Sequence, residues 1–398
     1  MLRSLFSGIS SLRSHQTMLD VTGNNIANAN TTGFKAGRTL FEDTLSQLVQ
    51  APGAPQGANG GTNPAQVGLG VRVAAVTNDF TPGAAQQTGR SLDMMINGDG
   101  FFVVNSGGEQ LYTRSGAFTL DALGRLVTSS GAQVQGWAAD ANGVVNPNGP
   151  LTGLALPVTT TMGARATGTA TFTGNLPADA AVDTALVRTI EVYAADGTAT
   201  SLDLTFTKQP GATWSVQVAD GSGNALGGGT VAFTAGGALQ AVNLPPVTVA
   251  GNPVALDLGQ LTGFAGLTTV EASSQDGQGA GVLQSFSMSA DGTLMGSFSN
   301  GLKRAVGLVA VGNFANAAGL EKTGGSMLRA SVNSGEPQVG RAGDGGRGSL
   351  TGGALEMSNV DLSQEFTNLI IAQRGFQAGS RVITTSDELL QELVNLKR

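Results

Sequence analysis

Few residues of this sequence have the types and spacing that catalysis or metal binding requires. The chain has 398 residues, no cysteine and a single histidine, His15. It therefore cannot form a disulfide and lacks the thiolate and multi-histidine ligand sets of zinc and iron–sulfur sites. The segment Gly324–Ser326 does not complete the G-x-S-x-G motif of a serine nucleophile. We predict no catalytic, cofactor-binding or metal residue, and an interfacial or solvated position for His15.

Two further patterns resemble ligand sites only formally. Gly343, Gly345 and Gly348 have the spacing G-x-G-x-x-G. A dinucleotide site needs a strand before this motif and a helix directly after it, whereas Pro337 precedes it and helix signals resume only near Ser358. We predict that 341–348 is a Gly-rich connection. The recurrent Asp-Gly pairs lack the spacing of calcium loops and indicate turns.

Composition excludes other classes of protein. Lysine plus arginine (21) against aspartate plus glutamate (28) gives a net charge of −7, so the basic surface of a nucleic-acid binder is missing. No run of 18 apolar residues is present, so we expect no membrane insertion. The N-terminus lacks the apolar core of a cleavable signal. Sparse charge and the absence of cysteine favour an extracellular protein that is exported without a cleaved signal peptide.

Both ends of the chain carry helix patterns. Apolar residues recur at intervals of three, four and seven, which is the heptad spacing of coiled coils. Caps at Ser358, Asn359 and Asp361 and an acidic first turn at Glu365 support a C-terminal helix from Val360 to Leu396. The predicted self-assembly positions are Leu5, Ile9, Leu12 and Leu19 (with Leu2) at one end and Leu362, Phe366, Leu369, Phe376, Ile383 and Leu390 (with Val394) at the other.

The interior is typical of β hairpins. Short apolar or alternating runs such as 101–104, 118–120, 134–138, 201–207 and 294–298 are separated by turn residues at about ten-residue spacing. The segment 51–64 is rich in Pro, Gly and Asn and indicates a linker. The fold class is therefore mixed and mainly β, with β-rich barrel or sandwich domains between long terminal helices.

The same pattern predicts nested domains. We expect 1–33 with 355–398 to form a terminal helical domain, 34–70 a linker, 71–151 with 264–354 a discontinuous β domain, and 152–263 an inserted outer β domain. Because linkers separate the heptad stripes from the β body, we favour packing between subunits over packing within one chain.

One segment carries a family resemblance. GNNIANANTTGFK, at 23–35, strongly resembles the signature of the bacterial flagellar rod and hook axial proteins. Asn and Gly cap helices and tolerate left-handed backbone, so the segment itself indicates a helix end that leads into a tight turn. The signature residues are Asn24, Asn25, Ile26, Ala27, Asn28, Asn30, Thr32, Gly33, Phe34 and Lys35.

Further segments resemble the hook proteins within this family. They are 91–104, 112–127, 134–137, 334–370 and 372–398, and only about 152–263 looks like a variable outer domain. The resemblance implies a structural, non-enzymatic subunit without cofactors that self-assembles into a curved helical tube, a flexible joint between rod and filament. The implied partners are copies of itself, the rod, the hook cap, the hook–filament junction proteins and the type III export apparatus.

Two alternatives stay open. A distal rod protein shares the terminal signatures, although such proteins are generally shorter and lack a large middle domain. A secreted β-sandwich adhesive or binding module would explain the Thr- and Gly-rich centre but leaves the terminal helices unexplained.

Overall fold

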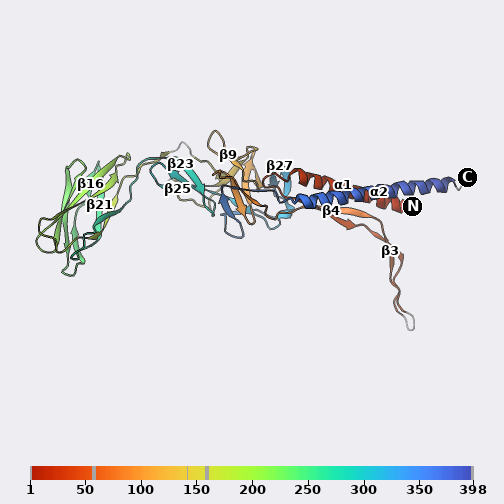
Figure 1. Ribbon diagram of the computed structural model, residues 1–398, viewed down its shortest axis with the longest axis horizontal. Helices are drawn as coiled ribbons and strands as arrows, with labels where there is room; N and C mark the ends of the chain where they lie inside the picture. The colour runs from red at the N-terminus through yellow and green to blue at the C-terminus, as the bar shows by residue number, and fades with distance from the viewer. Residues whose placement is uncertain (1, 56–59, 141, 157–160, 396–398) are drawn as a thin grey trace. The chain divides into compact units, whose positions relative to one another are not determined.

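The computed structural model describes residues 2–55, 60–140, 142–156 and 161–395. The chain divides into two compact units, and each is described separately. Unit 1 contains 1–156, 287–295 and 305–398, and unit 2 contains 157–286 and 296–304. The expectation of a mainly β chain with a helix at each end is confirmed (Figure 1). No helix in the described ranges is long and apolar enough to cross a membrane.

The two predicted terminal helices are α1 (Leu2–Ala27) and α2 (Leu362–Asn395). Asp361 caps α2, since its Oδ1 accepts hydrogen bonds from the backbone N–H groups of Ser363 (2.8 Å) and Gln364 (3.3 Å). The 34 residues of α2 correspond to about 50 Å of helix. Beyond α1, Gly33 has a φ of +67°, so the predicted turn after the helix is confirmed.

The region predicted as a linker, 34–70, contains strands instead. β1 (Gly37–Asp43) pairs antiparallel with β4 (Val71–Asn78), and β2 (Ser46–Gln50) pairs with β3 (Ala65–Gly68). The Pro- and Gly-rich segment forms the tip of this long hairpin, with a bridge between Gly53 and Thr62, and its residues 56–59 lie outside the described ranges. The composition of this segment indicates a linker because its turn residues outnumber those of the short, exposed strands on either side.

The β body of unit 1 is built from short antiparallel strands. In the centre of its largest sheet, the hydrogen-bonded strands follow the order β25-β11-β7-β8-β28-β27. The predicted hairpin strands of this region are present as β7 to β11. Phe101, Tyr112, Trp137 and Phe314 form its aromatic core. The elements are β5 (Ala85–Gln87), β6 (Met94–Asn97), β7 (Phe101–Ser106), β8 (Glu109–Thr113), β9 (Phe118–Leu120), β10 (Leu126–Thr128), β11 (Gln133–Ala138), β12 (Thr152–Gly153), β24 (Thr293–Phe298), β25 (Lys303–Val309), β26 (Val311–Asn313), η1 (Ala317–Gly319), β27 (Glu321–Gly324), β28 (Met327–Arg329), β29 (Gln338–Gly340), β30 (Ser349–Gly352) and β31 (Ala354–Glu356).

The glycine-rich segment at 341–348 is a turn between β29 and β30. Gly343 and Gly345 have φ of +83° and +58°, and Arg347 Nε donates to the carbonyl of Arg341 at 2.9 Å. A strand, not a helix, follows the glycines. The backbone thus has the geometry of a tight turn rather than that of a phosphate cradle.

Unit 2 contains two sheets around one apolar core. The five-stranded antiparallel sheet has the order β15-β16-β17-β18-β19, and the four-stranded sheet has the order β20-β21-β14-β22. Trp214, Phe206 and Phe172 are fully buried in the shared core. The strands are β13 (Thr161–Met162), β14 (Thr169–Asn175), β15 (Ala185–Tyr193), β16 (Ala199–Lys208), β17 (Thr213–Asp220), β18 (Ala225–Phe233), β19 (Leu239–Asn243), β20 (Val247–Val249), β21 (Asn252–Thr262), β22 (Glu271–Gln275) and β23 (Gly281–Met288).

Unit 2 extends past the boundary predicted for the inserted domain at 263. β22 pairs antiparallel with β14, from Ala170 opposite Gln275 to Thr173 opposite Glu271. The four-stranded sheet is therefore incomplete without residues beyond 263. This boundary does not follow from the sequence, because all strands of the five-stranded sheet lie between β14 and β22 along the chain.

Candidate functional site

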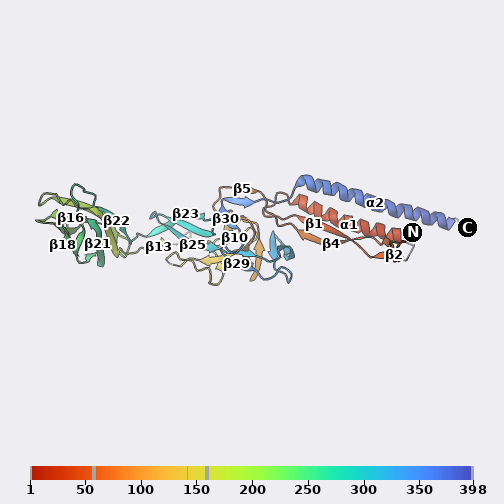
Figure 2. The same ribbon diagram turned by 90° about the horizontal axis from the view of Figure 1, so that it is seen from below.

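The terminal helices pair antiparallel in unit 1, α1 beside α2 (Figure 2). Ser4 lies against Ser386 (3.4 Å between hydroxyls), and Asn25 lies against Glu365 at the other end. Small residues make this contact close. A Cβ at Gly8 would stand 3.3 Å from the Ile383 side chain, and one at Gly379 would stand 3.2 Å from that of Leu12. The glycines thus bring the two backbones together.

His15 lies in the same seam. A Cβ at Gly375 would overlap the His15 ring, and this ring is 5.8 Å from the ring of Phe41 in β1. The predicted interfacial position of His15 is therefore observed. In α2 the spacing of Ala372, Gly375 and Gly379 on one face is the sequence signal for this seam. The heptad pattern of large apolar residues does not contain this signal, because the seam residues are small.

Small residues in the seam leave much of the large apolar stripe uncovered. Phe6, Phe366, Ile370, Ile371 and Leu389 are each more than half exposed in this chain. Among the predicted assembly residues, those half-buried are Leu5, Leu12, Leu19, Leu369, Ile383 and Leu390, and those exposed are Ile9, Leu362, Phe366 and Phe376. On α2, Phe366 and Ile370 are one helical turn apart, and exposed apolar side chains that gather in this way mark a protein–protein contact.

The signature segment connects α1 to the β body. Asn25 is buried, its Nδ2 donates to the carbonyl of Gly37 (2.8 Å), and its Oδ1 accepts from the Gly37 N–H (2.9 Å). Gly33 N–H donates to the carbonyl of Glu356 at 2.8 Å, and a Cβ at Gly33 would overlap the backbone of Ser115. Asn25 and Gly33 thus fix the path of the chain as it leaves the helix.

The remaining signature residues play smaller parts in this connection. Asn28 Nδ2 donates to Asn24 Oδ1 at 3.0 Å, and the hydroxyls of Thr32 and Ser115 lie 3.3 Å apart. Ile26 is half-buried, whereas Ala27 and Asn30 are exposed.

A buried ion cluster lies at the end of the signature. Glu356 in β31 accepts from Lys35 Nζ at 2.6 Å and from Arg114 Nε at 2.9 Å, and all three side chains are almost fully buried. Arg114 also donates to the carbonyls of Gly98 (2.8 Å) and Gly100 (2.6 Å). The cluster joins the N-terminal segment, the β body and the strand that precedes α2.

Burial and charge act in opposite directions on Glu356. Burial alone would raise its pKa, but the positive charge of Arg114 and the hydrogen bonds from Lys35, Arg114 and the Gly83 N–H together hold the pKa of Glu356 below its usual value. Burial lowers the pKa of Lys35, and the hydrogen bond and negative charge of Glu356 offset only part of this effect. We therefore expect the carboxylate to stay ionised.

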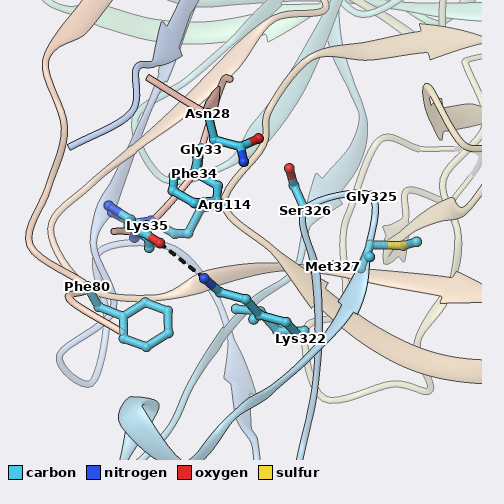
Figure 3. Close-up of a pocket in the computed structure, with 12 residues that line it drawn as sticks. Asn28, Gly33, Phe34, Lys35, Phe80, Arg114, Lys322, Gly325, Ser326 and Met327 are labelled. Atoms are coloured by element: carbon cyan, nitrogen blue, oxygen red, sulfur yellow. Dashed lines mark hydrogen bonds between the residues drawn. The ribbon is translucent and has the colours of Figure 1, made fainter. Parts of the chain in front are cut away.

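A cavity of about 200 Å³ lies beside this cluster (Figure 3). Lys322 Nζ donates to the Lys35 carbonyl at 3.2 Å and lies 4.9 Å from the centre of the Phe34 ring. These are a hydrogen bond and a cation–π contact, and both hold the signature turn against β27. The contacts among these residues are those of a structural joint.

Comparisons with known proteins match these regions. The family model described as "Flagella basal body rod protein" matches 6–35, "Flagellar hook protein FlgE/F/G D1 domain" matches 95–171, and "Flagellar basal body rod FlgEFG protein C-terminal" matches 351–396. The first covers most of α1 and the signature, and the third covers α2.

Relatives match over the full length. Flagellar hook protein FlgE of Borreliella burgdorferi is 37% identical over 100% of both chains, and that of Salmonella typhimurium is 35% identical over 99% of this chain and 100% of its own. Flagellar basal-body rod protein FlgG of Bacillus subtilis is 34% identical over 100% of both chains.

A solved structure shows the same fold. The crystal structure of Helicobacter pylori flagellar hook protein FlgE2 has a TM-score of 0.53 at 14% identity and covers 70% of this chain and 99% of its own. With the full-length relatives, the signature and the terminal helix pair, these findings show that the chain belongs to the flagellar hook protein (FlgE) family.

Proposed function

We propose that this protein is the structural subunit of a bacterial flagellar hook and that it self-assembles into a curved helical tube. The observation that carries the proposal is full-length similarity to hook proteins in a chain whose paired terminal helices expose a long apolar stripe. A contact between different surfaces of identical subunits propagates without closing and gives a helical filament. The apolar stripe supplies such a contact along the inside of the tube.

The finer parts of the proposal follow from the family. The tube joins rod to filament as a flexible joint, and its partners are the rod, the hook cap and the hook–filament junction proteins. The subunit reaches the outside of the cell through the flagellar export apparatus and works as a mechanical part rather than as an enzyme. The predicted roles of Leu5, Ile9, Leu12, Leu19 and the α2 stripe in assembly belong to this proposal.

Electron microscopy of the purified protein tests the proposal. Curved tubes of regular diameter are expected as the concentration rises. A compact monomer at every concentration would contradict it. Expression in a bacterium that lacks its hook gene is the companion experiment, with restored motility as the expected outcome.

A second candidate is a distal rod subunit, because the rod protein of B. subtilis matches over 100% of both chains. Chain length therefore does not separate the two. Straight, short cylinders from the purified protein and rescue of a rod mutant, but not of a hook mutant, would favour this candidate.

A further inference from the structure

The cavity beside the signature turn, in unit 1, has an excess of positive charge (Figure 3). Three of its lining residues are cations, Lys35, Arg114 and Lys322. The carboxylate of Glu356 engages the first two and brings one negative charge to them. Within the described ranges the lining itself contains no aspartate or glutamate. A concave site with one sign of charge favours ligands of the opposite sign, so this cavity is suited to an anion.

Lys322 is the cation of this cavity that has unused donors. An ammonium has three N–H donors, and among the described residues it finds one acceptor, the Lys35 carbonyl at 3.2 Å. Figure 3 shows the Lys322 nitrogen among the lining side chains, pointing toward Lys35. Burial lowers the pKa of Lys322, and no carboxylate of the described chain acts against this effect. An anion at this nitrogen would supply the missing counter-charge.

The uncharged part of the lining is largely apolar. Phe34, Phe80, Met327 and Leu328 contribute two aromatic rings and two aliphatic side chains. Both Phe34 and Phe80 are half-buried, so part of each ring is left for a ligand to cover. An apolar cavity of about 150 Å³ holds a benzene ring, so about 200 Å³ gives room for one ring with a small substituent.

A ligand can reach this cavity from solvent. Lys322, Gly324 and Gly325 are lining residues that are exposed, which places the opening at the turn between β27 and β28. The two glycines have no side chain that would cover the opening. The charged nitrogen and the apolar lining are therefore accessible to a small molecule.

We propose that this cavity binds a small aromatic carboxylate, with the carboxylate on the ammonium of Lys322 and the ring against the apolar lining. A charge-assisted hydrogen bond fixes the anionic end, and burial of the ring adds apolar contact. Such a ligand contacts both β27 and the signature turn, so its binding stabilises the connection between them by mass action. The inference concerns unit 1 alone and does not depend on the proposed self-assembly.

The test is a ligand-observed NMR titration of the dilute full chain with benzoate. We expect saturable binding with a Kd of about 1 mM or below, as for a small ligand of this size. Lys322→Met keeps the apolar stem and removes the ammonium, and it is expected to weaken binding about tenfold or more. Lys322→Arg keeps the charge and should retain binding. Lys303→Met is the matched control, because Lys303 is exposed and outside the lining, and it should bind benzoate as the unaltered chain does.

Two further probes separate the charge from the ring. Benzyl alcohol has the ring without the charge, and acetate has the charge without the ring, so each is expected to bind about tenfold more weakly than benzoate. Raising the pH from about 7 to about 10 should weaken benzoate binding to the unaltered chain, because Lys322 loses its proton, but not to Lys322→Arg, which stays charged. Circular dichroism of each variant establishes that it is folded.

Three results would overturn the inference. Benzoate that shows no saturation at about ten times the expected Kd would mean that the cavity takes no such ligand. Equal binding of benzoate and benzyl alcohol would mean that the ammonium recognises no anion. Equal losses in Lys322→Met and Lys303→Met would assign the effect to the net charge of the chain. All three leave hook assembly untouched, since the titration does not measure tubes.

Discussion

At Glu356, three segments that are far apart in the sequence meet on one carboxylate. Replacement by Gln leaves Lys35 and Arg114 buried without their counter-charge, so we expect a loss of about 3–5 kcal/mol in the free energy of unfolding. Urea denaturation of the full chain measures it. Glu109→Gln is the control, because its pair with Arg329 is about half exposed and is expected to cost no more than about 1 kcal/mol.

The same carboxylate predicts a pH dependence. The pKa of Glu356 is lowered in the folded chain, so the unfolded chain binds its proton more readily. Its contribution is complete above the unfolded pKa of about 4.3 and is lost as the pH falls through the lower folded pKa. The urea midpoint should therefore drop more steeply below about pH 4 in the unaltered chain than in Glu356→Gln. Parallel curves would show that Glu356 does not contribute.

Only part of the Lys35–Arg114–Glu356 ion cluster could be predicted from the sequence. Lys35 belongs to a recognisable segment, but its partner Glu356 is 321 residues away, and Arg114 is 242 residues from Glu356. Neither Arg114 nor Glu356 sits in a pattern that requires an ion pair, because such pairs depend on tertiary approach. Glu365 lies in the first turn of α2, as the sequence predicts, but its contact with Asn25 does not follow from helix rules.

Among the elements, the helix pair depends on its glycines. In Gly379→Leu the new side chain meets Leu12 and the Gly8 carbonyl, so the helices must separate. Overpacking costs about 1–3 kcal/mol, which exceeds the helix-propensity gain of about 1 kcal/mol. We expect the helical signal at 222 nm to melt at a lower temperature in circular dichroism. Gly23→Leu, where a Cβ meets nothing within 4 Å, is the control and should melt no earlier.

Heptad spacing predicted where the helices lie but not which face of each is covered. Apolar periodicity and capping residues predicted a C-terminal helix from Val360 to Leu396, close to the observed Leu362–Asn395, and Leu396 lies outside the described residues. The covered face instead follows Gly8, Gly375 and Gly379, because glycine permits an approach that leucine forbids. The strands β2 and β3 were missed since they are short, exposed and separated by turn residues.

For the whole molecule, the apolar stripe should matter to assembly and not to folding. Phe376 is 39% exposed, so Phe376→Asp is expected to cost the monomer about 1–2 kcal/mol, from the buried part of the ring and the low helix propensity of Asp, and to leave the β units folded while it abolishes tubes. Negative-stain microscopy and urea denaturation measure the two effects. Val187→Asp, at an exposed position of β15 in unit 2, is the control and should still assemble. If Phe376→Asp still forms normal tubes, the apolar stripe is not part of the assembly contact.

The antiparallel helix pair also constrains the order in which the molecule matures. Ser4 and Ser386 are 382 positions apart, yet they touch. In any process that delivers the chain from its N-terminus, α1 appears first and its partner α2 appears last, whereas hairpins such as β15–β16 need only local contacts. The β units can therefore fold while α1 still lacks its partner α2. The helix pair that carries the apolar stripe forms only when the last part of the chain has been delivered.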